Sequence, residues 1–180
     1  MIKTENLKIF EETIRSALDK ISRENIIARI WSKDPSLWKK EGNEISNCLG
    51  WLFSPEKISR AFPKIKKFVR QVRQDGYTHA LLLGMGGSIL AAEVLGSVFQ
   101  TSESYLDLSI LDSTDPAAVL TFKESLDPEK TLFLVSSKSG RTIETTSFFK
   151  FFFNWVRETL GESEAGAHFV AITDPGTPLE

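Results

Sequence analysis

The segment Thr131–Thr145 reads TLFLVSSKSGRTIET, a short apolar run followed by hydroxyl side chains, one glycine and the start of a long apolar-periodic stretch. This pattern predicts a buried strand over residues 131–136 and a helix over residues 142–160. Unpaired N–H groups and the positive end of the helix dipole favour an anion at such a helix start. Small hydroxyl side chains add hydrogen-bond donors there without excluding a phosphate by bulk or charge. The segment therefore predicts a phosphate-binding loop.

The same alternation of strand and helix extends on both sides of this segment. Further strands are expected over residues 80–83, 106–111 and 169–173, and further helices over 89–99 and 116–126. Strands and helices that alternate at this spacing predict an α/β fold with a doubly wound parallel sheet and right-handed crossovers. After the last expected strand the sequence continues only as the turn-forming run Asp174–Glu180, so we expect a domain truncated at its C-terminus.

The N-terminal part of the sequence is helical in pattern. Apolar stripes predict two helices within residues 6–33, and a longer helix begins at Ser54 as N-cap with Pro55 as the first helical residue. That helix is expected to bend or restart at Pro63 and to end at residues 75–76. We therefore expect two domains, a helical segment over residues 1–76 that packs on the sheet and an α/β domain over residues 77–180.

Composition limits the classes of partner. The 180 residues carry a net charge of −2 with 41% hydrophobic residues, which does not suggest a nucleic-acid surface. Lys and Arg cluster only within residues 64–73, where their spacing favours the solvated face of an amphipathic helix over a binding patch. The single Cys48, the charged N-terminus and the lack of a membrane-length apolar run predict a cytoplasmic protein without a membrane partner.

The loops after the expected strands are the candidate ligand sites, because open α/β sheets bind ligands beyond the carboxyl ends of their strands. Gly84–Ser88 reads GMGGS, where Gly86 and Gly87 allow close approach of the backbone and Ser88 adds a hydroxyl at a helix start. A dinucleotide fingerprint would need a third glycine, and Ile89 stands in that region instead. The loop lacks the Gly-Lys-Ser/Thr of a Walker motif as well.

Charged residues in the other loops have both structural and functional interpretations. Asp115 is expected to cap the helix that begins at Pro116, which favours a structural role for the run 112–116 over ligand contact. Lys138 and Arg141 could pair with a dianionic phosphate or point to solvent. Glu144 is a conceivable proton-transfer base, but its place in the first helical turn is more typical of a residue that complements the helix dipole.

The sequence offers few groups for chemistry. His79 and His168 begin strands at the edge of the sheet opposite the ligand loops, so we assign neither to catalysis. No metal-ligand spacing is present, and we expect no metal and no catalytic residue in this segment.

The helix expected after the phosphate loop is unusually aromatic. It contains Phe148, Phe149, Phe151, Phe152, Phe153 and Trp155. These side chains cover more than one core-facing stripe, so one side should pack on the sheet and the other on the N-terminal helices or on a further domain or subunit.

Taken together, the three loops 84–88, 112–116 and 136–145 resemble the first sugar isomerase (SIS) domain of the glucose-6-phosphate isomerase family. Their order and separation fit across residues 78–180. The stretch 31–52 is similar to the bacterial branch that includes bifunctional transaldolase/glucose-6-phosphate isomerases. The resemblance implies an SIS-type sheet with flavodoxin-like strand order and an N-terminal fragment of a longer isomerase of glycolysis and gluconeogenesis.

The resemblance also implies roles for individual residues. The phosphate of glucose 6-phosphate or fructose 6-phosphate would be held by the hydroxyls of Ser88, Ser137, Ser139 and Thr142 and by the backbone N–H groups of Gly87 and Lys138. In the family a glutamate moves a proton between C1 and C2 without metal or organic cofactor. That glutamate and its partners come from later sequence, so this segment alone is expected to be inactive. A second SIS domain and a homodimer are implied for the parent protein.

Departures from the family pattern keep another interpretation open. Ile89 and Ala92 stand where serine and proline are common, and Arg141 stands where threonine is usual. The run Ser-Gly-Arg-Thr also resembles other phosphosugar-binding SIS domains. The alternative is a non-catalytic SIS module that senses a phosphosugar and regulates a partner.

Overall fold

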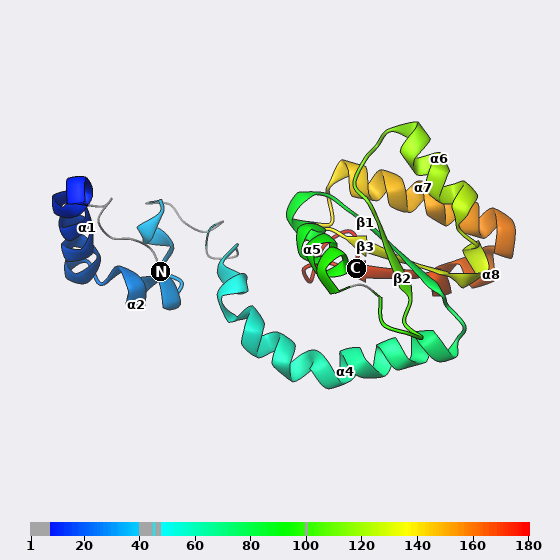
Figure 1. Cartoon of the computed structure of the whole chain (residues 1–180), viewed down its shortest axis with the longest axis horizontal. Coiled ribbons are helices and arrows are strands. Elements are labelled where there is room, and N and C mark those ends of the chain that lie inside the picture. Colours follow the sequence, from blue (N-terminus) through cyan, green and yellow to red (C-terminus); the bar gives the residue numbers. More distant parts are fainter. Residues whose placement is uncertain (1–7, 40–44, 46–47, 100) are drawn as a thin grey trace. The chain divides into compact units, whose positions relative to one another are not determined.

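The computed structural model describes residues 8–39, 45, 48–99 and 101–180 (Figure 1). The chain divides into two compact units, Met1–Ile65 and Lys66–Glu180. The boundary between them falls within helix α4 (Ser54–Gln74). The division into domains at residues 76 and 77 stays a prediction.

A four-stranded parallel sheet forms the centre of the second unit (Figure 1). Its strands are β1 (His79–Gly84), β2 (Asp107–Leu111), β3 (Thr131–Ser136) and β4 (Phe169–Ile172), in the order β2-β1-β3-β4. Helices α5 (Leu90–Phe99), α6 (Pro116–Ser125) and α7 (Ile143–Leu160) connect them. The expected α/β class, parallel sheet and flavodoxin-like order are thus confirmed.

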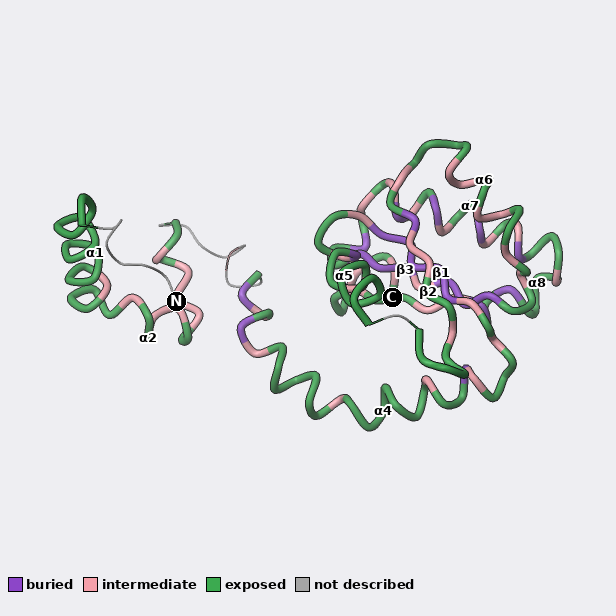
Figure 2. The backbone as a smooth tube through the Cα atoms, in the orientation of Figure 1, coloured by how far each residue is buried: buried purple, intermediate pink, exposed green. Residues whose placement is uncertain are grey.

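One side of the sheet carries the main hydrophobic core. Leu81, Leu83, Phe133 and Val135 alternate along β1 and β3 and are buried against Phe148, Phe152 and Val156 of α7. Side chains of α6, among them Phe122, pack against the same cluster. Figure 2 shows the buried residues concentrated in the strands and in α7. The central strands β1 and β3 are buried along nearly their whole length, as is typical of the inner strands of a parallel sheet.

The aromatic side chains of α7 find their partners within the second unit. Phe133 stacks on Phe152 and Phe169, with ring centroids 5.3 and 4.8 Å apart. Phe149 and Phe153 contact the ring of Phe169 at 5.5 and 5.4 Å. These rings therefore pack on strands β3 and β4, which confirms the packing of one side of α7 on the sheet. The partner expected for its other side, the N-terminal helices or a further domain or subunit, stays a prediction.

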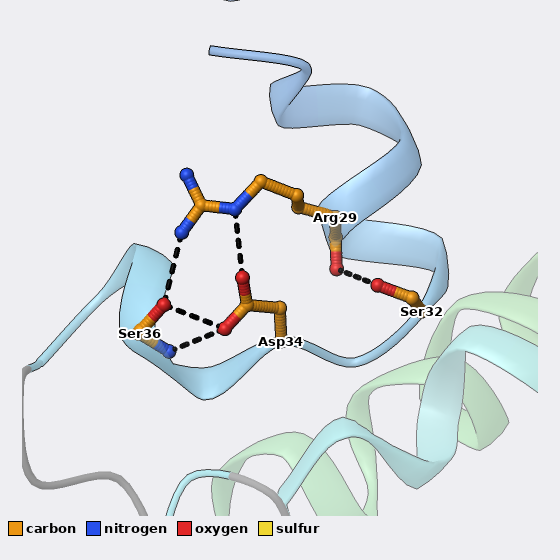
Figure 3. A network of polar contacts seen from close by, with 4 residues as sticks. All are labelled: Arg29, Ser32, Asp34 and Ser36. Carbon is orange, nitrogen blue, oxygen red and sulfur yellow. Dashed lines mark hydrogen bonds and ion pairs between the residues drawn. The ribbon is translucent and has the colours of Figure 1, made fainter.

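Among its described residues, the first unit contains α1 (Glu11–Arg23), α2 (Ile26–Trp31) and the 3-10 helices η2 (Pro35–Leu37) and η3 (Leu49–Phe53). Asp34 organises the turn after α2 (Figure 3): its Oδ1 accepts hydrogen bonds from the backbone N–H and hydroxyl of Ser36 at 2.9 and 2.6 Å. Its Oδ2 lies 2.7 Å from Nε of Arg29. These interactions with Ser36 and Arg29 lower the pKa of Asp34 from 3.8 to about 2.

Helix α4 differs from the sequence-based expectation at its start. Ser54 is itself helical, with φ −61° and ψ −40°, because η3 runs directly into α4. The expected N-cap role of Ser54 is therefore wrong. Of the two outcomes expected at Pro63, the restart is wrong, because the helix is continuous through this residue, and the bend stays a prediction. Among the described residues, no helix is long and apolar enough to cross a membrane.

Candidate phosphate-binding site

The loops after β1 and β3 begin side by side. The parallel register pairs Gly84 with Ser136, the last residues of their strands. The Ser136 hydroxyl donates a hydrogen bond to the carbonyl oxygen of Ser88 at 3.3 Å. The glycine loop and the hydroxyl-rich loop, 48 residues apart in the sequence, are therefore joined at the carboxyl edge of the sheet.

The glycine loop turns tightly over this edge. Gly84 has no room for a side chain, because a Cβ there would lie 2.8 Å from Cγ2 of Ile89 and 3.0 Å from the carbonyl oxygen of Ser136. Gly86 has φ +51° and opens the 3-10 helix η4 (Gly86–Ser88). Gly87 is exposed and Ser88 is half-buried. Helix α5 begins at Leu90, three residues after Gly87 and two after Ser88.

Two hydroxyl groups pair at the start of α7. Ser137 is buried, with 1% of its surface exposed, and its Oγ lies 2.9 Å from Oγ1 of the half-buried Thr142. Thr142 is the N-cap of α7, yet its side chain makes no capping hydrogen bond to the helix. An N-cap hydroxyl ordinarily satisfies one of the free N–H groups of the first turn. Here the hydroxyl is turned to Ser137, so these donors stay available to another acceptor.

The remaining predicted ligands on this loop are exposed. Ser139 accepts a hydrogen bond at Oγ from the backbone N–H of Arg141 at 3.3 Å. Nζ of Lys138 lies 4.0 Å from Oδ2 of Asp174, and both side chains are more than half exposed. Such an exposed ion pair adds little stability, about 0–1 kcal/mol. Lys138 is thus a cation whose present carboxylate partner is easily exchanged.

The loop after β4 supports the site, a contribution that the sequence did not reveal. The backbone N–H of Asp174 donates to the carbonyl oxygen of Lys138 at 3.1 Å. The hydroxyl oxygens of Thr173 and Thr177 lie 2.6 Å apart and form a hydrogen bond. Gly140 has φ +63°, and a Cβ there would lie 2.7 Å from Oγ1 of Thr177. The threonine side chain therefore packs against the bare backbone of the hydroxyl-rich loop.

Thr145 is a second residue that sequence reasoning missed. It is fully buried in the first turn of α7, and its Oγ1 has no hydrogen-bond partner. Thr145 follows Thr142 by three residues, so the two side chains share one face of the helix. An unpaired buried hydroxyl costs about 1–3 kcal/mol and calls for an explanation. The i, i+3 spacing of two threonines at a helix start was the available signal.

The other candidates are one aspartate with a structural role, one glutamate next to the hydroxyl-rich loop and two distant histidines. Asp115 caps α6, with its Oδ1 accepting from the N–H of Ala117 at 2.7 Å, which is the favoured structural role. Glu144 is half-buried in the first turn of α7. His79 begins β1 and His168 immediately precedes β4, both at the opposite edge of the sheet. Within the part of the chain that the structure describes, no group of three or more His, Cys, Asp or Glu could hold a metal ion.

Comparison with known proteins matches this chain to one family. The family model described as phosphoglucose isomerase matches residues 55–178. A glucose-6-phosphate isomerase of Thermus thermophilus is 34% identical over 134 residues, which cover 73% of this chain and 30% of that relative. Glucose-6-phosphate isomerase 1 of Colwellia psychrerythraea is 30% identical over 128 residues, or 66% of this chain and 23% of that relative. The chain thus spans less than a third of the length of these relatives.

Solved structures show the same fold. A hypothetical protein of Thermus thermophilus superposes with a TM-score of 0.63 and 29% identity, covering 92% of this chain and 37% of that one. A glucose-6-phosphate isomerase of Chlamydia trachomatis gives a TM-score of 0.62 over 83% of this chain and 28% of that one. Its 21% identity supports the fold alone. The family match over residues 55–178, which includes all three loops, carries the conclusion: the chain belongs to the phosphoglucose isomerase family.

Proposed function

We propose that this chain supplies the phosphate-binding part of a glucose-6-phosphate isomerase, an enzyme that interconverts glucose 6-phosphate and fructose 6-phosphate. The relatives named above carry that activity in their names, and the chain covers about 30% of one of them. The observation that carries the proposal is the paired hydroxyls of Ser137 and Thr142 at the uncapped start of α7. A dianionic phosphate matches this group of donors and the positive end of an 18-residue helix.

The proposed phosphate ligands come from both loops. They are the hydroxyls of Ser88, Ser137, Ser139 and Thr142 and the backbone N–H groups of Gly87 and Lys138. The hydrogen bond from Ser136 to Ser88 supports their joint action, because it fixes one loop against the other. The hydroxyl of the buried Ser137 orients Thr142, whose side chain is the more exposed of the pair.

Two further groups extend this set. The Oγ1 of Thr145 is buried and unpaired, one turn into the helix from the phosphate position. A phosphate oxygen or a water molecule bound with it would supply the missing acceptor or donor. Lys138 adds a positive charge that can move from Asp174 to the phosphate.

The chain alone is proposed to bind the sugar phosphate without isomerising it. Both histidines lie at the edge of the sheet opposite the loops, and the proposed ligands are hydroxyls, N–H groups and a lysine. None of the proposed ligands is a carboxylate that could act as the base of the isomerisation. The proton-transferring glutamate of the family, a second SIS domain, a homodimeric assembly and a cytoplasmic location are proposed for the parent protein.

The test is a calorimetric titration of the chain with fructose 6-phosphate, which measures the binding affinity. Ser137→Ala removes the hydroxyl that orients Thr142 and is expected to weaken binding by about tenfold, the equivalent of one charge-assisted hydrogen bond. Ser125→Ala is the matched control, since the Ser125 hydroxyl only bonds the carbonyl oxygen of Phe122 in α6. Equal affinity of the wild-type chain and Ser137→Ala would refute the assignment.

A further inference from the structure

A cavity lined by polar side chains lies at the edge of the sheet opposite the phosphate loops. It has a volume of about 420 Å³ and is lined by Arg70, Arg73, Gln74, Tyr77 and Ser104. Two arginines come from the last turns of α4, Tyr77 precedes β1 and Ser104 precedes β2. The strands separate this cavity from the phosphate loops by roughly 20 Å, the length of a six-residue strand. It is therefore distinct from the site described above.

The charged residues that line the cavity are all positively charged. Its lining contains two guanidinium groups, an amide and two hydroxyls, but no carboxylate. Among nearby acids, Asp75 is engaged by the side-chain amide of Gln71 at 2.7 Å. Asp75 and Glu164 raise the pKa of Tyr77 further, after burial as the main cause, so the phenol stays neutral.

Arg73 is held in place yet not satisfied. Its guanidinium carbon lies 4.5 Å from the centroid of the Tyr105 ring, a cation–π contact. Its Nε is buried and has no hydrogen-bond partner. Arginines in the last turn of a helix often only complement the helix dipole, but that role leaves the guanidinium in solvent. A guanidinium that is held against an aromatic ring at the wall of a cavity is instead an arrangement suited to bind an oxyanion through its terminal N–H groups.

We propose that the cavity lined by Arg70, Arg73 and Ser104 is a second anion site, which binds a dianionic phosphoryl group, free or carried by a small metabolite. The volume is within the range of small-molecule sites, about 300–1,000 Å³, and exceeds what a single oxyanion fills. Each arginine in the lining carries several N–H donors that can bond two phosphoryl oxygens at once, and the Ser104 hydroxyl is a further donor. The Tyr77 hydroxyl already donates to the carbonyl oxygen of Ala167 at 3.0 Å, so it contributes shape and an acceptor.

The chain offers a readout confined to this cavity. It contains two tyrosines, and both lie here: Tyr77 in the lining and Tyr105 beneath Arg73. Incorporation of 3-fluorotyrosine therefore gives two fluorine resonances that report on this site and not on the phosphate loops. Inorganic phosphate and inorganic pyrophosphate are the probes, each titrated against sodium chloride of equal ionic strength.

We expect saturable shifts of the fluorine resonances with phosphate, pyrophosphate or both, beyond those caused by chloride. Arg73→Gln and Arg70→Gln should each weaken the response by about tenfold or more. Lys67→Gln is the matched control, because it removes one exposed positive charge from the same helix outside the cavity. If Arg73→Gln fails to fold, the exposed Arg70 decides the outcome.

Three results would overturn the proposal: no response beyond that of chloride, an equal loss in Lys67→Gln and Arg70→Gln, or loss of the response in Ser137→Ala. The last variant separates the two sites. A Ser137→Ala chain that no longer binds fructose 6-phosphate but keeps its tyrosine response to phosphate supports both proposals. A Ser137→Ala chain that still binds fructose 6-phosphate with the wild-type affinity and keeps its tyrosine response to phosphate refutes the proposed function, but it supports the second anion site.

Discussion

Gly140 tests how the loop after β4 supports the phosphate loop. The residue has φ +63°, and an added Cβ would lie 2.7 Å from Oγ1 and 2.8 Å from Cβ of Thr177. Alanine in the left-handed region costs about 1–2 kcal/mol. Forcing a methyl group into a filled space costs about a further 1–3 kcal/mol. We therefore expect Gly140→Ala to lower the free energy of unfolding of the second unit by about 2–5 kcal/mol.

Gly86→Ala separates the two contributions. Gly86 also has a positive φ, +51°, but no atom lies within 4 Å of its added Cβ. Its substitution should cost only the backbone penalty of about 1–2 kcal/mol. Thr177→Gly in the Gly140→Ala background should recover part of the larger loss, because it removes the two nearest of the three atoms that the new methyl group meets and leaves only the backbone nitrogen of Leu179, at 3.2 Å.

Amide hydrogen exchange of β3 is the assay, since those amides open with the whole second unit. The reasoning is refuted if Gly140→Ala costs no more than Gly86→Ala. It is also refuted if Thr177→Gly and Gly140→Ala are simply additive, because residues in contact should show a coupling of about 0.5–3 kcal/mol.

Three more substitutions or conditions test the site and its surroundings. Thr145→Val should leave the ligand-free chain as stable as the wild type or slightly more stable in thermal unfolding, because the lost hydroxyl has no partner. The same substitution should weaken fructose 6-phosphate binding severalfold, as measured by calorimetry. Phe133→Ala should destabilise the second unit by about 3–5 kcal/mol in urea unfolding, since the ring is fully buried. The pKa of Asp34 is lowered to about 2, so the turn that it forms with Ser36 and Arg29 should be intact above pH 3.8 and be lost as the pH falls through about 2. Carbon-13 titration of the Asp34 carboxyl measures this, and a midpoint near 3.8 would contradict it.

Much of the second unit could be predicted from sequence because its signals are local. A short apolar run such as 131–136 is too brief for a helix and too apolar for an exposed strand. Alternation with helical patterns then fixes a parallel sheet, and right-handed crossovers leave few strand orders. Hydroxyls and glycines at strand ends could be assigned to one edge of the sheet by the same rule.

The parts that were missed depend on contacts between distant residues. Thr177 packs against Gly140 only because β4 lies beside β3. No local sequence pattern in either segment predicts this contact. Phe169 joins the aromatic side chains of α7 for the same reason. The N-cap expected at Ser54 failed because the preceding residues form a 3-10 helix, which continues the helical backbone through that serine.

The stacking of Arg73 on Tyr105 could not be predicted from sequence for a different reason. Sequence spacing places Arg70 and Arg73 on a helix face and favours solvent exposure for both. The burial of Arg73 Nε arises from residues about 30 positions later, which turn back over the end of α4. A cluster of basic residues can therefore be recognised from sequence, whereas the satisfaction of its individual donors cannot.

Backbone amide shifts during a titration with fructose 6-phosphate show whether the two loops bind the phosphate. The account predicts saturable shifts concentrated at Gly87, Ser88, Lys138, Ser139 and the first turn of α7, with the Thr142 and Thr145 amides among the largest. Inorganic phosphate should shift the same amides, because the phosphate is the group recognised. Shifts confined to other loops, or none at these amides at saturating sugar phosphate, would contradict the account.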